Sequence, residues 1–157
     1  MILAEDFEDF IKLLNNHRVD YLIVGGYAMA FHGKPRYTGD LDIWIDISDA
    51  NAANMLLVIN EFGFSSLGFK KDDFLKENLI NQIGFPPLRI DIITSIDGVN
   101  FSDANSSKLV IELEGFDVNY IGLQELIINK KASARKIDLS DVEDLEKEQK
   151  RRGVPKL

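Results

Sequence analysis

The stretch DLDIWIDI, residues 40 to 47, constrains the fold of this chain more than any other. Successive side chains of a β-strand point to opposite faces. The predicted strand therefore carries Asp40 and Asp42 on one face and an aliphatic row on the other, formed by Leu41, Ile43, Ile45 and Ile47. The aliphatic row needs a core beneath it, and paired carboxylates are ligands that hard cations such as Mg²⁺ prefer. We expect a half-buried strand with a metal site on its polar face.

The segment before this strand predicts a phosphate site. Residues 20 to 25, DYLIVG, are typical of a short buried strand. Gly25-Gly26 then allows a tight turn into a helix over 27 to 32, which Gly33 and Pro35 end. A helix that begins directly after a strand and two glycines presents free backbone N–H groups to an anion. Gly25 and Gly26 are therefore candidate phosphate ligands.

The rest of the chain predicts helices interleaved with non-adjacent strands. A strand is expected over 88 to 94 and a hairpin over 109 to 121, turning at Glu114-Gly115. Ser140 and Glu143 have the spacing of a capping box for the last helix. Residues 64 to 87 are expected to be irregular, apart from a short helix over 72 to 78. The other helices are expected at 3 to 17, 49 to 62, 122 to 132 and 139 to 150. This order predicts an α/β (α+β) domain with a mixed β-sheet.

Length and charge restrict the class of protein. The chain has 157 residues, no cysteine, an acidic first segment and no apolar run near the roughly 20 residues of a membrane span. We expect one cytoplasmic domain over 1-157, with a catalytic core at about 20-95 and a C-terminal hairpin and helices at 109-150. A net charge of −8 argues against a broad nucleic-acid surface, although basic residues cluster at 130 to 136 and 147 to 152.

Three aspartates form the candidate catalytic group. Asp91 lies on the second predicted strand, on the same face as Arg89. Carboxylates on two strands beside a glycine turn indicate metal-assisted phosphoryl or nucleotidyl transfer. In that scheme Asp40 and Asp42 hold the metals. Asp91 binds the catalytic ion and accepts or orients the proton of the attacking hydroxyl, provided that it lies beside the other two.

The motifs together resemble a known superfamily. Gly25-Gly26, then Arg36-x-Thr38-x-Asp40-x-Asp42, then a strand with Asp91, is similar to the polymerase-β-type nucleotidyltransferases. The similarity is to its compact prokaryotic branches, the AbiEii-type toxin nucleotidyltransferases among them. It continues in a C-terminal segment with Lys130, Ala132, Arg135, Asp138 and Asp141. The resemblance implies a nucleotidyltransferase fold, a mixed sheet with helices packed on one face.

The resemblance also implies a reaction. Two Mg²⁺ ions would bind Asp40, Asp42 and Asp91, and an NTP would contact a set formed by Gly25, Gly26, Arg36, Thr38 and Lys130. The enzyme would move an NMP to a hydroxyl acceptor, with RNA such as a tRNA, a small molecule and a protein all open. A toxin role would bring a cognate antitoxin, and a homodimer is also open. Two positions depart from the pattern: Gly26 stands where many members have Ser, and Ile137 where Lys often precedes the matched Asp138.

Other interpretations accompany each motif. The chain could be a catalytically silent nucleotide-binding or regulatory module, an antibiotic-type adenylyltransferase, or an unrelated α/β domain. Trp44 could stack on a base or pack beneath a helix. His32 is expected as a packed ring or helix-end charge rather than a catalytic base, and two histidines without cysteine make a zinc site improbable. Asp91 could simply pair with Arg89, and Lys130 could serve only the dipole of its helix.

Overall fold

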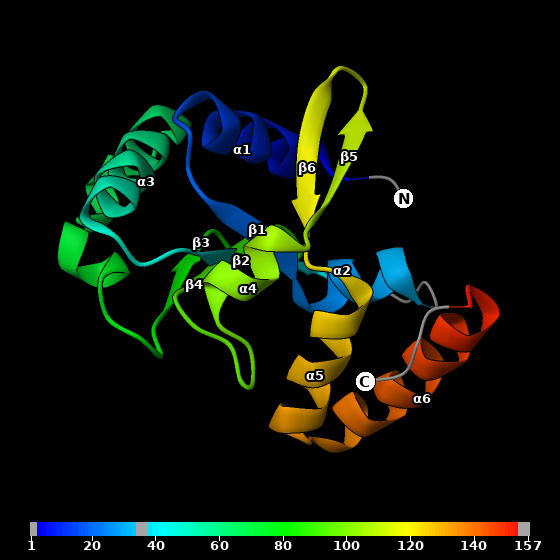
Figure 1. Ribbon diagram of the computed structural model, residues 1–157. Coiled ribbons are helices and arrows are strands. Elements are labelled where there is room, and N and C mark those ends of the chain that lie inside the picture. The colour runs from blue at the N-terminus through cyan, green and yellow to red at the C-terminus, as the bar shows by residue number, and fades with distance from the viewer. Residues whose placement is uncertain (1–2, 34–37, 154–157) are drawn as a thin grey trace.

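The computed structural model describes residues 3–33 and 38–153, and its centre is a six-stranded mixed sheet (Figure 1). The strands are β1 (Tyr21–Val24), β2 (Asp40–Ile45), β3 (Ile80–Ile83), β4 (Arg89–Ile93), β5 (Leu109–Leu113) and β6 (Phe116–Tyr120). Their order is β3-β4-β2-β1-β6-β5. β2 runs parallel to β4 and antiparallel to β1, and β1 is parallel to β6. The predicted mixed-sheet α/β fold is therefore confirmed.

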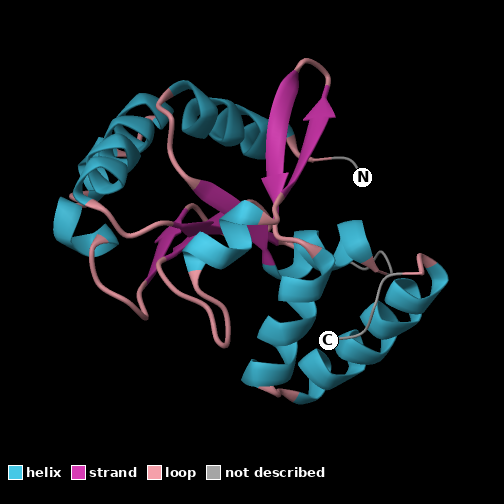
Figure 2. Cartoon of the chain, in the orientation of Figure 1, coloured by secondary structure: helices cyan, strands magenta, loops and turns pink. Residues whose placement is uncertain are grey.

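Helices flank the sheet and form a separate pair near the C-terminal end. They are α1 (Glu5–Asn16), α2 (Gly25–His32), α3 (Asp49–Phe62), α4 (Phe101–Ser106), α5 (Leu123–Ser133) and α6 (Lys136–Arg151). Figure 2 shows α5 and α6 side by side, joined by a short turn, and both contact α2. In the described part of the chain, no helix has the length and apolar character needed to cross a membrane.

A large part of the hydrophobic core lies on the sheet face opposite Asp40 and Asp42. Leu41, Ile43 and Ile45 are fully buried on this face, as the alternation predicts. α1 and α3 cover it, and Phe10 of α1 meets Phe62 of α3 edge to face at 5.0 Å between ring centroids. The hydrophobic row of β2 thus fixes which face of the strand remains for the aspartates.

At Trp44 the face of the sheet that carries the aspartates is covered by α4. It lies on the same face of β2 as the aspartates, and its ring packs edge to face on Phe101 of α4 at 5.1 Å. Trp44 is buried. The interpretation of Trp44 as a packing residue therefore agrees with the structure, and its ring is not free to stack on a base.

Several local expectations were wrong. α2 begins at Gly25 rather than at residue 27, and α6 begins at Lys136 rather than at 139. Ser140 and Glu143 lie inside α6, so they form no capping box; the Asp138 carboxylate instead accepts the backbone N–H of Arg135 at 3.2 Å. The helix predicted over 72 to 78 is only a 3₁₀ turn, Lys71–Phe74.

Three short elements were not predicted, namely β3, α4 and a 3₁₀ turn at Ser65–Leu67. β3 is short and polar, INQI, and its pairing with β4 comes from the neighbouring strand rather than from its own pattern. α4 has only six residues, but Asn100 caps it by accepting the N–H of Asp103 at 2.9 Å. That Asn-x-x-Asp spacing is a helix-start signal that the sequence did carry.

Candidate active site

The register of two parallel strands brings the three aspartates together. Asp42 on β2 is the direct partner of Asp91 on β4, and Asp40 is the partner of Arg89. Neighbouring strands lie about 4.8 Å apart. Because Asp40 and Asp42 share a face of β2, the three carboxylates and the guanidinium form one cluster on the polar face of the sheet.

Arg89 links two of these carboxylates. Its Nη2 donates to Asp40 Oδ2 at 2.6 Å, while Nε and Nη2 donate to the two oxygens of Asp91 at 2.9 and 3.1 Å. Asp91 is buried, so these two bonds fix its orientation. The ion pair that was an alternative for Asp91 is therefore present in the structure, and it extends to Asp40.

The surroundings of Asp42 disfavour the charged form of its carboxyl. Burial raises the pKa of its carboxyl, the negative charges of Asp91 and Asp40 raise it further, and the result is about 7. The positive charge of Arg89 acts in the opposite direction but does not cancel these effects. Three carboxylates face one cation, so the cluster has room for additional positive charge.

The cluster offers the oxygen ligands that a divalent ion prefers, but its side chains are not arranged as a complete metal site. Within residues 3–33 and 38–153, no three acidic or histidine side chains are already arranged to hold a metal. Arg89 forms ion pairs with both Asp40 and Asp91. The donor set is nevertheless all carboxylate oxygen, as Mg²⁺ prefers. Burial first, and then the charges of Asp91 and Asp40, raise the pKa of Asp42, so a cation beside it would favour its charged form. Asp40, Asp42 and Asp91 are the residues that would hold the ion.

The glycine turn packs directly against this cluster. Gly25 has φ +66°, and a Cβ there would lie 2.0 Å from Oδ2 of Asp42. A Cβ on Gly26 would lie 2.5 Å from Oγ1 of Thr38, whose hydroxyl donates to the Asp40 carbonyl at 3.4 Å. The missing side chains thus allow the N-terminus of α2 to approach the aspartates. Thr38 also occupies the space that a serine at position 26 would need.

Lys130 and Gly25 both line a cavity of about 400 Å³. The Lys130 side chain is only 6% exposed, and its Nζ lies 2.8 Å from Oδ2 of Asp141 and 3.5 Å from Oδ1 of Asp138. Hydrogen bonds from Arg135 and Ser133 outweigh the effect of burial on Asp138 and lower its pKa to about 2. Lys130 therefore joins α5 to α6 as well as facing the glycine turn, which is more than a helix-dipole role.

Arg135 was not among the predicted site residues, yet it lines the same cavity. Its side chain is 73% exposed and its Nε donates to Asp138 at 2.7 Å. Asn129 and Ser133 also line the cavity, and their i,i+4 spacing on α5 places them on one face of that helix. That spacing was the available signal for them. Arg36, a predicted phosphate ligand, lies outside the described residues.

His32 is a packed ring, as one interpretation of the sequence held. It is buried, and its Nε2 lies 2.6 Å from the carbonyl oxygen of Ile121. Burial lowers the pKa of the imidazole. Phe31 packs edge to face on it at 4.9 Å. These contacts tie the end of α2 to the segment that follows β6.

Comparisons with known proteins inform the fold of this chain. No protein-family model and no curated protein matches the sequence. Among solved structures, TM1012 of Thermotoga maritima, provisionally assigned as a nucleotidyltransferase, aligns at 17% identity with a TM-score of 0.56, over 94% of this chain and 90% of that one. LnuA, a lincosamide antibiotic adenylyltransferase solved with lincomycin, aligns at 16% identity with a TM-score of 0.53, over 92% and 97%.

A third solved structure also aligns with this chain. ANT(2'')-Ia, solved with adenylyl-2''-tobramycin, aligns at 13% identity with a TM-score of 0.58, over 94% of this chain and 92% of that one. Identities this low carry information about the fold, and function has to be argued from the site. This chain therefore has the nucleotidyltransferase fold, with its three aspartates gathered beside the glycine turn.

Proposed function

We propose that the chain is a metal-dependent nucleotidyltransferase that moves an NMP from an NTP to a hydroxyl and releases pyrophosphate. The pairing of Asp42 with Asp91 across β2 and β4, directly against Gly25, carries this proposal. It supports the proposal because carboxylate oxygens, the ligands that Mg²⁺ prefers, lie next to backbone N–H groups at a helix N-terminus. Phosphoryl transfer depends mainly on positioning and charge stabilisation, and these groups supply both.

The triphosphate would lie between the glycine turn and the α5–α6 pair. Gly25, together with Gly26 next to it in the chain, would offer backbone donors, and Lys130 and Arg135, which line the same cavity as Gly25, would offer positive charge. Thr38 and Arg36 complete the proposed set of phosphate contacts. Divalent ions held by Asp40, Asp42 and Asp91 would neutralise the triphosphate and polarise the α-phosphate.

The acceptor hydroxyl would attack the α-phosphorus. A new P–O bond forms, the bond to the bridging oxygen breaks, and pyrophosphate leaves. Asp91 would accept the hydroxyl proton, and the two hydrogen bonds from Arg89 hold its carboxylate in place for this role. Arg89 is in this scheme a positioning residue.

A second cavity favours a small acceptor over a large RNA. It has a volume of about 620 Å³, within the usual range of small-molecule sites, and its lining includes Trp44. Asp46, Glu77 and Asp103 also line it, and no described lining residue is basic. Three carboxylates repel RNA phosphates but suit a hydroxylated molecule that carries positive charge. An antibiotic-type adenylyltransferase is therefore our preferred form of the proposal.

Labelled nucleotide transfer tests the proposal. The protein is incubated with Mg²⁺ and each α-labelled NTP, with total RNA, a panel of hydroxylated and cationic small molecules, or no acceptor. The control is Asp40→Asn/Asp42→Asn, which keeps side-chain shape. We expect transfer to a small molecule by the wild type alone. Transfer to RNA would instead support the toxin role and its antitoxin. NTP binding without transfer would support a silent module, and no binding would overturn the proposal.

A further inference from the structure

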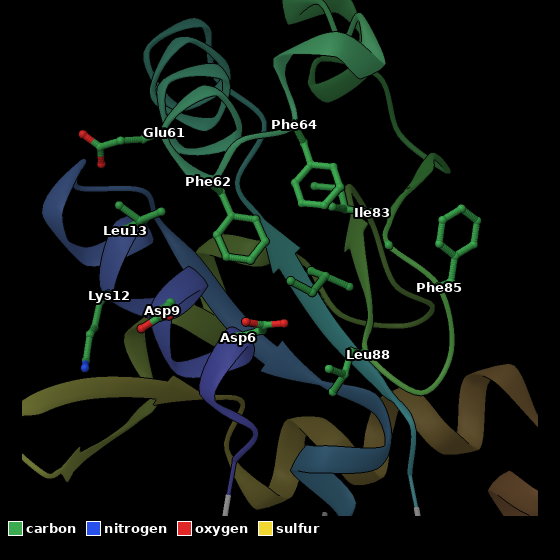
Figure 3. A pocket seen from close by; sticks show the side chains of 12 residues that line it. Asp6, Asp9, Lys12, Leu13, Glu61, Phe62, Phe64, Ile83, Phe85 and Leu88 are labelled. Atoms are coloured by element: carbon green, nitrogen blue, oxygen red, sulfur yellow. The ribbon is translucent and has the colours of Figure 1, made fainter.

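A further cavity lies on the sheet face opposite the aspartates. It has a volume of about 760 Å³, and α1, α3 and the β3–β4 region enclose it (Figure 3). Ile90 forms part of its floor and is adjacent in sequence to Asp91, so the two side chains point to opposite faces of β4. Nothing in the proposed nucleotidyl transfer uses this cavity.

Apolar side chains form the walls of the cavity, and one of these side chains is unusually exposed. Phe62 and Phe64 stack at 5.6 Å between centroids on one side, and Leu13 extends this wall. Phe85 and Leu88 form the other side (Figure 3), and Phe85 is 85% exposed. An aromatic side chain with this exposure beside an apolar hollow is characteristic of a surface that binds a partner.

Acidic residues border the cavity. Asp6 and Asp9 lie one turn apart on α1, so they share a face of that helix. Asp6 is in the first turn, where the helix dipole favours a carboxylate, but Asp9 lies beyond that turn. Glu61 also lines the cavity and faces His17 at 3.2 Å.

Among the described residues that line the cavity, Lys12 alone is basic, and it does not offset these charges. Nζ of Lys12 lies 5.0 Å from the centroid of the Phe116 ring, and Figure 3 shows its side chain running away from the cavity. The occupant therefore meets an apolar hollow with negative charge along one border. Phosphate groups and a second copy of this chain, with its net charge of −8, are both disfavoured there.

We propose that this cavity docks a segment of another protein that inserts an aromatic or aliphatic side chain between Phe62 and Leu88 and places lysine or arginine residues against Asp6 and Asp9. Apolar anchors supply most of the affinity of such contacts, and complementary charge supplies orientation and specificity.

Three labelled peptides test this inference by fluorescence anisotropy. They are KKSWLSKK, the anchor-free KKSSGSKK and the charge-reversed EESWLSEE. We expect the first to bind at least about tenfold more tightly than either of the others. Asp6→Lys/Asp9→Lys should remove that preference. The matched control Glu112→Lys/Glu143→Lys changes the same amount of charge at exposed positions outside the cavity and should retain it.

A second variant separates docking from general charge attraction. Leu88→Ser should weaken binding of KKSWLSKK at least about tenfold while leaving the circular dichroism spectrum and melting temperature unchanged, since Leu88 is partly exposed. Equal binding of the first two peptides, indifference to both cavity variants, or no binding of any peptide would overturn the inference. So would self-association in ultracentrifugation that Leu88→Ser abolishes, because the cavity would then belong to a second copy.

Discussion

At the scale of single residues, an excess of carboxylates governs the polar face of the sheet. Asp40, Asp42 and Asp91 share one guanidinium, that of Arg89, which bonds to the first and the last of them. The carboxyl of Asp42 is buried and lies near the negative charges of Asp91 and Asp40. Its protonation is therefore coupled to the stability of the fold.

Asp42→Asn should make the metal-free protein more stable at neutral pH. The folded pKa of Asp42, about 7, lies above its unfolded value near 3.8, so the stability contributed by the protonated carboxyl is lost as pH rises through 7. At about 1.4 kcal/mol per pKa unit, the advantage of the variant should grow from zero near pH 4 to at most about 4 kcal/mol above pH 7. Urea unfolding in EDTA from pH 4 to 8 measures it.

The exposed Asp72→Asn is the control and should show no such trend. A variant less stable than the wild type at pH 8 would contradict the prediction, because it would mean that Asp42 is stabilised as the carboxylate.

Gly25→Ala should reduce stability and disturb the aspartates. A left-handed φ costs a non-glycine residue about 1–3 kcal/mol, and the added Cβ would also displace Asp42. Gly63→Ala is a matched control, because Gly63 has φ +99° but open space around its Cβ position. We expect both variants to lose stability in urea, and Gly25→Ala alone to lose stabilisation by Mg²⁺ and NTP. Equal losses in both assays would mean that the contact with Asp42 is unimportant.

At the scale of elements, alternation along β2 and β4 predicts which side chains share a face, because that rule is local. Alternation cannot predict register. The pairing of Asp42 with Asp91 joins strands separated by α3, two 3₁₀ turns and β3, so only the folded sheet sets it. The same limit explains Arg135, whose approach to the glycine turn depends on how α5 and α6 pack against α2.

Lys130→Met should weaken the α5–α6 pair. The variant removes a buried cation from between Asp138 and Asp141, and loss of one partner of a buried ion pair costs about 3–5 kcal/mol. Lys130→Met/Asp141→Leu should recover much of that loss because it removes a buried charge as well. Chemical denaturation of the three proteins measures both effects. If the double variant were the least stable, the ion pair would not be the source of the loss.

At the scale of the whole molecule, a continuous apolar core joins elements from α1 to α6. It includes Phe7 and Phe10 from α1, Ile43 from β2, and Leu126 and Leu145 from the C-terminal pair. Chains of this size with one core commonly unfold in a single cooperative step. The length of the chain led us to expect one domain, which stays a prediction, whereas the contact of α2 with α5 and α6 is seen only in the structure.

Unfolding should therefore be two-state when followed by two different probes. Trp44 is the only tryptophan, it is buried, and it reports on the sheet. Far-ultraviolet circular dichroism reports mainly on the helices. We expect coincident urea transitions from the red shift of Trp44 emission and from helix loss. Loss of helix signal at lower urea than the Trp44 transition would contradict a single cooperative step, because some of the helices would then unfold before the sheet.

β4 carries a residue of the apolar cavity on one face and a residue of the carboxylate cluster on the other. Ile90 lines the apolar cavity and Asp91 stands in the carboxylate cluster, one peptide bond apart on a strand paired on both sides. An occupant at Ile90 that displaced β4 would also move Asp91, because the two residues are neighbours on one strand. Linkage is reciprocal, so any factor by which an occupant of the cavity changes nucleotide affinity must also be the factor by which nucleotide changes affinity for that occupant.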